Sequence, residues 1–118
     1  SSVCVDWVAG SCMLAQRNAL KAVGGFDERF FLYWEDADLC RRLRADGGEI
    51  RYVPDATIVH YVGHSSRTVP VLATRAFHDS AYLYYSTHVA SSPFNPARWF
   101  AKFALRARCE WQLRRAGG

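Results

Sequence analysis

One stretch in the middle of the chain, residues 30–40, constrains the fold more than any other. It begins with five apolar residues, four of them aromatic, and runs directly into three acids, Glu35, Asp36 and Asp38. Dense apolar residues favour burial, whereas carboxylates are buried only where they are paired or used. The stretch therefore predicts a buried aromatic segment that carries a cluster of acids.

From Asp36 onward the apolar residues recur at helical spacing, and the arginines fall on the opposite face until the glycines at 47–48 end the pattern. The acids then lie at a helix N-terminus, where carboxylates act as caps and complement the helix dipole. We assign this structural role to Asp38. Glu35 and Asp36 crowd against Trp34, an arrangement that suits a carboxylate acting as a general base.

The hydrophobic pattern along the chain predicts alternating strands and helices. Strands are expected over residues 3–8, 12–15, 49–53 and 57–61, and further helices over 16–23, 73–89 and 95–115. This alternation argues for an α/β fold with a mostly parallel or mixed sheet and flanking helices, followed by two C-terminal helices.

Polar residues at strand ends are the other candidates for a site, because loops at strand ends collect binding groups. His60 closes a β-branched strand and opens a polar loop, on which His64 is the weaker candidate. Asp6 interrupts the first strand and either faces solvent or shares a pocket with Asp36. Gly10, between the first two strands, permits a close approach that a side chain would forbid.

The composition excludes several classes of protein. Half of the 118 residues are hydrophobic, which argues against disorder, yet no apolar run is long enough to span a membrane. The four cysteines show neither metal-type spacing nor CxxC pairing, so we expect reduced, buried thiols in a cytoplasmic protein. The chain has no initiator Met, and we expect it to be a piece of a longer protein.

The net charge of +4 comes from the last third of the chain, where residues 73–118 carry seven basic and two acidic side chains. The helix predicted over 95–115 has an apolar face, with Arg98, Lys102 and Arg106 on the other face. Such a helix either packs on its own domain or lies on an anionic membrane surface. Nucleic acid is not an expected partner, because no RNA-binding motif or aromatic platform accompanies the charge.

Five segments, taken in order, carry a resemblance to a known family. They are residues 5–14, 23–31 with Gly-Gly-Phe-Asp at 24–27, 34–40 with Trp-Glu-Asp-Ala-Asp-Leu-Cys, 52–54 and 59–61. The set resembles the C-terminal half of a glycosyltransferase family 2 catalytic domain, and within it the bacterial rhamnosyltransferase-like and galactofuranosyltransferase-like enzymes. The resemblance implies an acceptor-side half over residues 1–72 of an A-type, nucleotide-sugar-binding fold, and a basic helical extension over 73–118.

The resemblance also implies roles for individual residues. Asp36 would be the catalytic base of an inverting sugar transfer, beside Trp34 and Glu35 in the acceptor site. His60 would complete a site for a divalent cation, Mg²⁺ or Mn²⁺. The other residues expected to bind substrate are Gly24, Gly25, Asp27, Asp6 and Trp7.

The family's donor-binding half and its Asp-x-Asp metal motif have no counterpart here. We therefore expect this piece to be inactive alone and to self-associate through its uncovered apolar face. In the full-length enzyme the partners would be a nucleotide-sugar donor and a glycan or lipid-linked acceptor, with peripheral membrane contact through residues 95–115 at the inner face of the plasma membrane. The alternative is a non-catalytic carbohydrate- or membrane-binding module.

Overall fold

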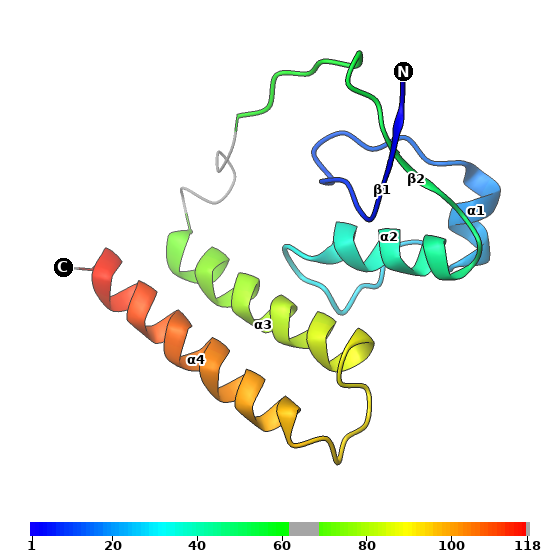
Figure 1. Cartoon of the computed structure of the whole chain (residues 1–118). Helices are drawn as coiled ribbons and strands as arrows, with labels where there is room; N and C mark the ends of the chain where they lie inside the picture. Colours follow the sequence, from blue (N-terminus) through cyan, green and yellow to red (C-terminus); the bar gives the residue numbers. More distant parts are fainter. Residues whose placement is uncertain (62–68, 118) are drawn as a thin grey trace. The chain divides into compact units, whose positions relative to one another are not determined.

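The computed structural model describes residues 1–61 and 69–117 and confirms the α/β class (Figure 1). The elements run in the order β1 (Val3–Val5), α1 (Arg17–Ala22), α2 (Glu35–Ala45), β2 (Ile50–Tyr52), α3 (Pro70–His88) and α4 (Ala97–Ala116). The described chain divides into two compact units. The first comprises residues 1–29 and 35–61, and the second comprises residues 30–34 and 69–117.

The first unit is built around one face of α2. Among the described residues the sheet has two strands, β1 and β2, which pair antiparallel rather than in the mostly parallel or mixed arrangement expected, with Val3 opposite Tyr52 and Val5 opposite Ile50. The buried core contains Leu39, Cys40, Leu43 and Ile50, and partly buried residues of α1 and the N-terminal segment pack against it. Three of these four residues lie on α2 at helical spacing, so the apolar periodicity after Asp36 does mark the buried face.

The glycine pair after α2 ends the helix as predicted. Gly47 has a φ of +88°, in the left-handed region that glycine adopts without a steric penalty. The N–H of Gly48 donates to the carbonyl of Leu43 at 2.9 Å, and a Cβ at Gly48 would lie only 2.9 Å from that same oxygen. A side chain at Gly48 would therefore disrupt the turn that leads into β2.

The second unit is a pair of packed helices, α3 and α4, which Figure 1 shows side by side and running in opposite directions. Small side chains on α3, including Ala73 and Ala76, are buried, as is Cys109 on α4. Just before α4, Asn95 Oδ1 accepts a hydrogen bond from the Ala97 N–H at 3.0 Å. Pro96 follows Asn95 with helical dihedral angles, φ −62° and ψ −24°.

Residues 30–34, which precede α2 in sequence, belong to this second unit. The hydroxyl of Ser80 on α3 donates to the Leu32 carbonyl at 2.9 Å. Phe30 is buried, but Phe31 is 73% exposed, so the prediction of a wholly buried aromatic segment is wrong at Phe31. The segment is held by specific contacts to α3 rather than by burial of all of its rings.

Two predicted strands are absent from the described residues, and the other two are shorter than predicted. Residues 12–15 and 57–61 are not strands, β1 ends at Val5 rather than at Val8, and β2 covers Ile50–Tyr52 rather than residues 49–53. Residues 57–61 are rich in β-branched side chains but all are exposed, so they lack the packing that gives such residues their strand preference. None of the helices described is both long enough and apolar enough to cross a bilayer.

Candidate functional site

Asp36 lies in the first turn of α2 with both carboxylate oxygens held by the main chain. Its Oδ2 accepts a hydrogen bond from the Gly10 N–H at 2.8 Å, and its Oδ1 accepts one from the Ala37 N–H at 2.7 Å. The side chain is half-buried, so part of the carboxylate faces solvent. A carboxylate oriented in this way is accessible and can accept a proton from a bound hydroxyl group.

The loop after β1 contacts the first turn of α2 at Gly10. A Cβ built at Gly10 would lie 3.5 Å from the Cβ of Asp36, which is ordinary van der Waals contact. A Cβ would therefore fit, so the prediction of an approach that a side chain would forbid is wrong at Gly10, although the loop does contact Asp36. The hydrogen bond itself could not be predicted, because it uses a backbone N–H that carries no sequence signal.

Glu35 is the first residue of α2, directly before Asp36. Its side chain is partly buried, and its Oε2 atom is buried without a hydrogen-bond partner in the part of the chain that the structure describes. Buried carboxylate oxygens normally have partners, and each exception calls for a reason.

Trp34 belongs to the second unit, where its ring packs against α3. Its centroid lies 5.9 Å from that of Phe77 and 5.2 Å from that of Tyr84. The indole Nε1 is buried and has no partner among the residues described. These contacts to α3 could be anticipated only from the apolar stripe on that helix, which includes both Phe77 and Tyr84.

The backbone at Tyr33 and Trp34 is strained. Their φ angles are +67° and +66°, so two consecutive aromatic residues occupy the left-handed region. This conformation costs bulky residues roughly 1–2 kcal/mol each, and such strain tends to collect at functional sites. Tyr33 could not be predicted as a candidate site residue, because nothing in the sequence around it signals a positive φ.

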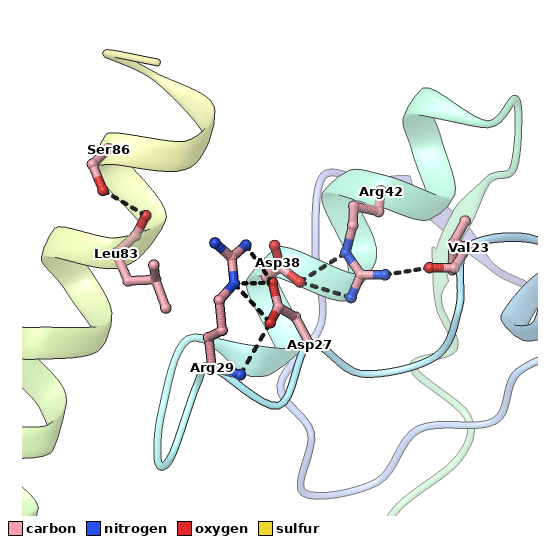
Figure 2. A network of polar contacts seen from close by, with 7 residues as sticks. All are labelled: Val23, Asp27, Arg29, Asp38, Arg42, Leu83 and Ser86. Carbon is pink, nitrogen blue, oxygen red and sulfur yellow. Dashed lines mark hydrogen bonds and ion pairs between the residues drawn. The ribbon is translucent and has the colours of Figure 1, made fainter. Parts of the chain in front are cut away.

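Asp38 is a buried ion-pair residue and not the helix cap that the sequence suggested (Figure 2). Because α2 already begins at Glu35, Asp38 lies within the first turn rather than at its start. Its side chain is only 1% exposed, and its Oδ2 accepts a hydrogen bond from Arg42 Nε at 2.8 Å. Arg42 also donates to the Val23 carbonyl at 2.8 Å, which ties α2 to the end of α1.

The Gly-Gly-Phe-Asp segment has clear local structural roles. Gly24 and Gly25 have φ angles of +76° and +73°, and the Gly25 N–H donates to the Leu20 carbonyl at 2.8 Å, which ends α1. Oδ2 of Asp27 accepts two hydrogen bonds from the Arg29 guanidinium, at 3.0 Å from Nε and 2.6 Å from Nη2 (Figure 2). These bonds lower the pKa of Asp27 to about 2. The predicted acceptor-binding role of this segment stays a prediction.

Asp6 and Trp7 lie on the surface of the first unit. The Asp6 side chain is 81% exposed and pairs with Arg44 at 2.8 Å. Arg44 lies eight residues beyond Asp36 along α2, which corresponds to about 12 Å of helix. The contact of Asp6 is therefore with the C-terminal end of α2 and not with Asp36. Trp7 is 54% exposed, and substrate binding by either residue stays a prediction.

His60 is exposed and lies outside the helices and strands. Across residues 1–61 and 69–117, no three His, Cys, Asp or Glu side chains gather closely enough to hold a metal ion. His64 lies outside the described residues. The described residues therefore do not form a complete cation site, and His60 could supply no more than one ligand to such a site.

Comparison with known proteins identifies clear relatives. The family described as glycosyltransferase like family 2 matches residues 1–92. The chain is 38% identical over 110 residues to the N-acetylglucosaminyl-diphospho-decaprenol L-rhamnosyltransferase of Mycobacterium tuberculosis, a match that covers 93% of this chain and 36% of that protein. It is 44% identical over 68 residues to the rhamnosyltransferase WbbL of Escherichia coli, covering 58% of this chain and 26% of the relative.

A third relative is the pre-mycofactocin glycosyltransferase of Mycobacterium tuberculosis, 35% identical over 74 residues, with coverage of 63% of this chain and 15% of that protein. No solved structure matches the chain significantly. The chain thus spans about a third of the length of the first relative, since the match covers 36% of that protein.

Proposed function

The chain belongs to the family described as glycosyltransferase like family 2, and from this premise we propose that it is the acceptor-side part of an inverting glycosyltransferase. The full-length enzyme would transfer a sugar from a nucleotide-sugar donor to a glycan or lipid-linked acceptor. The observation that carries this proposal is the carboxylate of Asp36, which is half-exposed and held by the N–H groups of Gly10 and Ala37.

Asp36 acts as the general base in this proposal. Inverting transfer requires the acceptor hydroxyl to attack the anomeric carbon of the donor sugar while the nucleoside diphosphate leaves from the opposite face. As the new glycosidic bond forms, the hydroxyl proton passes to Asp36, and the electron pair of the broken bond stays with the diphosphate. Main-chain hydrogen bonds hold the base in one orientation, which reduces the reorganisation needed in the transition state.

Glu35 and Trp34 are proposed to bind the acceptor. The Glu35 side chain is only partly buried, and a carboxylate can accept a hydrogen bond from a sugar hydroxyl group. The Trp34 side chain is also only partly buried, and its indole combines an apolar ring with one N–H group. An aromatic body with one polar group suits a sugar, which presents both apolar faces and hydroxyl groups.

A divalent cation stays a proposal in which His60 supplies one ligand. Mg²⁺ and Mn²⁺ prefer several oxygen ligands, and the carboxylates would have to come from outside the described residues. Such an ion would stabilise the charge of the leaving diphosphate. In this proposal His60→Ala lowers turnover, and higher Mn²⁺ or Mg²⁺ partly restores it.

The lipid-linked acceptor is supported by the name of one relative, which specifies a diphospho-decaprenol. An enzyme with such an acceptor would work beside a membrane, and we propose the cytoplasmic face of the plasma membrane as its location. We further propose that the chain is inactive without the donor-binding part of the enzyme.

The test is Asp36→Asn in the full-length enzyme, with donor affinity and turnover measured separately. The substitution keeps the size of the side chain but removes the proton acceptor, so kcat should fall by about 10²–10⁴-fold while donor binding is retained. Asp46→Asn, at an exposed position just after α2, is the matched control and should leave both unchanged. Retention of more than about a tenth of wild-type turnover by Asp36→Asn would contradict the base assignment.

The second candidate function is a module that binds carbohydrate without chemistry, favoured by the partly exposed aromatic and carboxylate side chains of Trp34 and Glu35. This reading predicts that an intact protein with wild-type Asp36 binds glycans but transfers no sugar from any nucleotide-sugar donor. Detection of transfer by the wild-type protein, together with its loss in Asp36→Asn, excludes it.

A further inference from the structure

Helix α4 presents large aromatic side chains to solvent. Phe100, Phe103 and Trp111 are 75%, 77% and 55% exposed, and Trp99, one residue before Phe100, is 77% exposed. At about 100° per residue these positions fall on one side of the helix, with Ala104 and Ala107 between them. We call this surface, made of Trp99, Phe100, Phe103, Ala104, Ala107 and Trp111, the aromatic face of α4.

The opposite side of α4 is the one that packs on α3. Cys109 is buried, and Ala101 and Leu105 are partly buried. Lys102 lies over the ring of Tyr82 on α3, at 5.6 Å from its centroid. The helix therefore meets its own unit through small and medium side chains and leaves its largest apolar side chains exposed. Burial of the largest apolar side chains would give the largest hydrophobic stabilisation, and α4 leaves these side chains exposed.

Basic side chains border the aromatic face. Residues 97–116 contain six Lys or Arg and a single acid, Glu110. At helical spacing Arg106 and Arg108 fall on opposite edges of the aromatic face, each about 100° from its centre. Arg115 stacks over Trp111, with its guanidinium carbon 4.5 Å from the ring centroid. By the same spacing, Arg114 falls within the face, about 20° from its centre, and Glu110 about 60° from it. Exposed aromatic residues together with an excess of cations are typical of helices that lie in a membrane interface.

We propose that the aromatic face of α4 binds the surface of an anionic membrane, with the helix axis parallel to the bilayer plane. The rings of Phe100, Phe103 and Trp111 would enter the region between headgroups and acyl chains. The arginines at the edges would contact lipid phosphates, with their alkyl stems against the apolar surface.

Charge complementarity favours an anionic membrane over a second copy of the chain or a duplex nucleic acid as the partner of the aromatic face. A second copy of the chain would bring the same excess of cations to the same face, and like charges oppose that contact. A duplex nucleic acid would contact the cations through its phosphates but would leave the large aromatic side chains of the face without an apolar partner. An anionic bilayer can contact both the aromatic and the basic side chains, because it has apolar acyl chains below a layer of phosphates.

The experiment is vesicle flotation of the intact protein with two lipid compositions, phosphatidylcholine alone and phosphatidylcholine with phosphatidylglycerol. We expect flotation with the anionic vesicles, weakened but not abolished by salt, because salt screens the charges and leaves the apolar contact in place. Lipids with brominated acyl chains should quench Trp fluorescence, and Trp99→Phe/Trp111→Phe should lose that quenching whereas Trp7→Phe keeps it. The vesicles contain no sugar acceptor, so this result is independent of the proposed transferase activity.

Two pairs of variants separate the contributions. Arg108→Gln/Arg114→Gln should weaken binding to anionic vesicles by about tenfold or more, whereas Arg17→Gln/Lys21→Gln removes the same charge from exposed positions of α1 and should have no comparable effect. Phe100→Gln/Phe103→Gln should also weaken binding, and Leu14→Gln, at a fully exposed apolar position outside α4, is its control. All seven of these side chains, four on α4 and three controls, are exposed, so the fold should tolerate their replacement.

Several outcomes would overturn the proposal. One is absence of flotation with anionic vesicles at low salt. Another is vesicle binding that Phe100→Gln/Phe103→Gln leaves unchanged while duplex DNA competes fully, which would show a general polyanion surface. A third is a shift from dimer to monomer in Phe100→Gln/Phe103→Gln without any vesicle binding by the wild-type protein, which would make the aromatic face a self-association surface.

Discussion

The N–H of Gly10 donates a hydrogen bond of 2.8 Å to Oδ2 of Asp36, a residue 26 positions further along the chain. This bond joins the loop after β1 to the first turn of α2. Because the donor is a backbone group, the orientation of the Asp36 carboxylate depends on the path of that loop and not on a neighbouring side chain. The loop and the helix therefore together determine the orientation of the proposed base, Asp36.

Gly10→Pro tests this dependence. Proline has no N–H, so Asp36 would lose one of its two main-chain donors, and a hydrogen bond to a charged group is worth about 1.5–3 kcal/mol. We expect kcat to fall by roughly tenfold or more, with donor affinity unchanged. Gly10→Ala retains the N–H, and its Cβ would meet Asp36 at an ordinary 3.5 Å, so its kcat should stay near wild type. Equal losses in both variants would show that the loop conformation, and not the hydrogen bond, matters.

The sequence was informative where local pattern and tertiary structure agree. Helix α2 and its glycine stop follow from periodicity and from the conformational freedom of Gly47, both of which are local properties. Residues 57–61 have the composition of a strand but are not paired, and pairing depends on a neighbour that local sequence does not specify. The sequence placed the large aromatic residues of α4 on one face, but only the structure shows that this face is exposed and that Lys102, on the other face, packs over Tyr82 of α3.

The acids show the same limit within the candidate site. The sequence predicted three carboxylates at the start of a helix but did not show which of them has which role. Each role depends on the group that the carboxylate contacts in the folded chain. Asp38 pairs with Arg42 one turn further along, while Asp36 meets Gly10 from a distant loop. The left-handed backbone at Tyr33 also has no local signal, since neither it nor Trp34 is a residue that favours positive φ.

Asp38→Ala should destabilise the fold far more than loss of a helix cap would. The Asp38 side chain is 1% exposed and its partner Arg42 is 24% exposed, so the substitution leaves a largely buried guanidinium without its acid. Breaking a buried pair in this way costs about 3–5 kcal/mol, against about 1 kcal/mol for a lost cap. Denaturant unfolding of the purified protein measures the difference.

The control for that measurement is the exposed pair between Arg51 and Glu49, whose side chains are 52% and 62% exposed. Glu49→Ala should cost less than about 1 kcal/mol, because water screens an exposed pair. If Asp38→Ala were no more destabilising than Glu49→Ala, the pair with Arg42 would not contribute to the stability of α2.

The pair of Asp27 and Arg29 predicts a stability that depends on pH. The hydrogen bonds from Arg29 lower the pKa of Asp27 from 3.8 to about 2, so the folded state favours the ionised carboxylate. The pair therefore stabilises the fold fully above about pH 4, and this contribution is lost as the pH falls through about 2. Arg29 is 61% exposed, so we expect less than about 1 kcal/mol from the pair.

Arg29→Gln is the corresponding test. Its melting temperature should be lower than that of the wild type at pH 6, and the gap should narrow as the pH falls below 4. Arg17→Gln, at an exposed position on α1, should show no such narrowing. A gap that stayed constant from pH 6 to pH 3 would mean that ionisation of Asp27 is not what Arg29 stabilises.

The four cysteines should divide into two reactive and two unreactive thiols. Cys4 and Cys12 are exposed, whereas Cys40 and Cys109 are buried, so the prediction that all four would be buried is wrong for the first two. Burial raises the pKa of the Cys40 and Cys109 thiols, which lowers the fraction of thiolate that can react at neutral pH. A brief treatment of the native protein with a thiol-alkylating reagent, followed by peptide mapping, should find label on Cys4 and Cys12 only. All four should be labelled after denaturation, and rapid labelling of Cys40 in the native protein would show that the core around α2 opens readily.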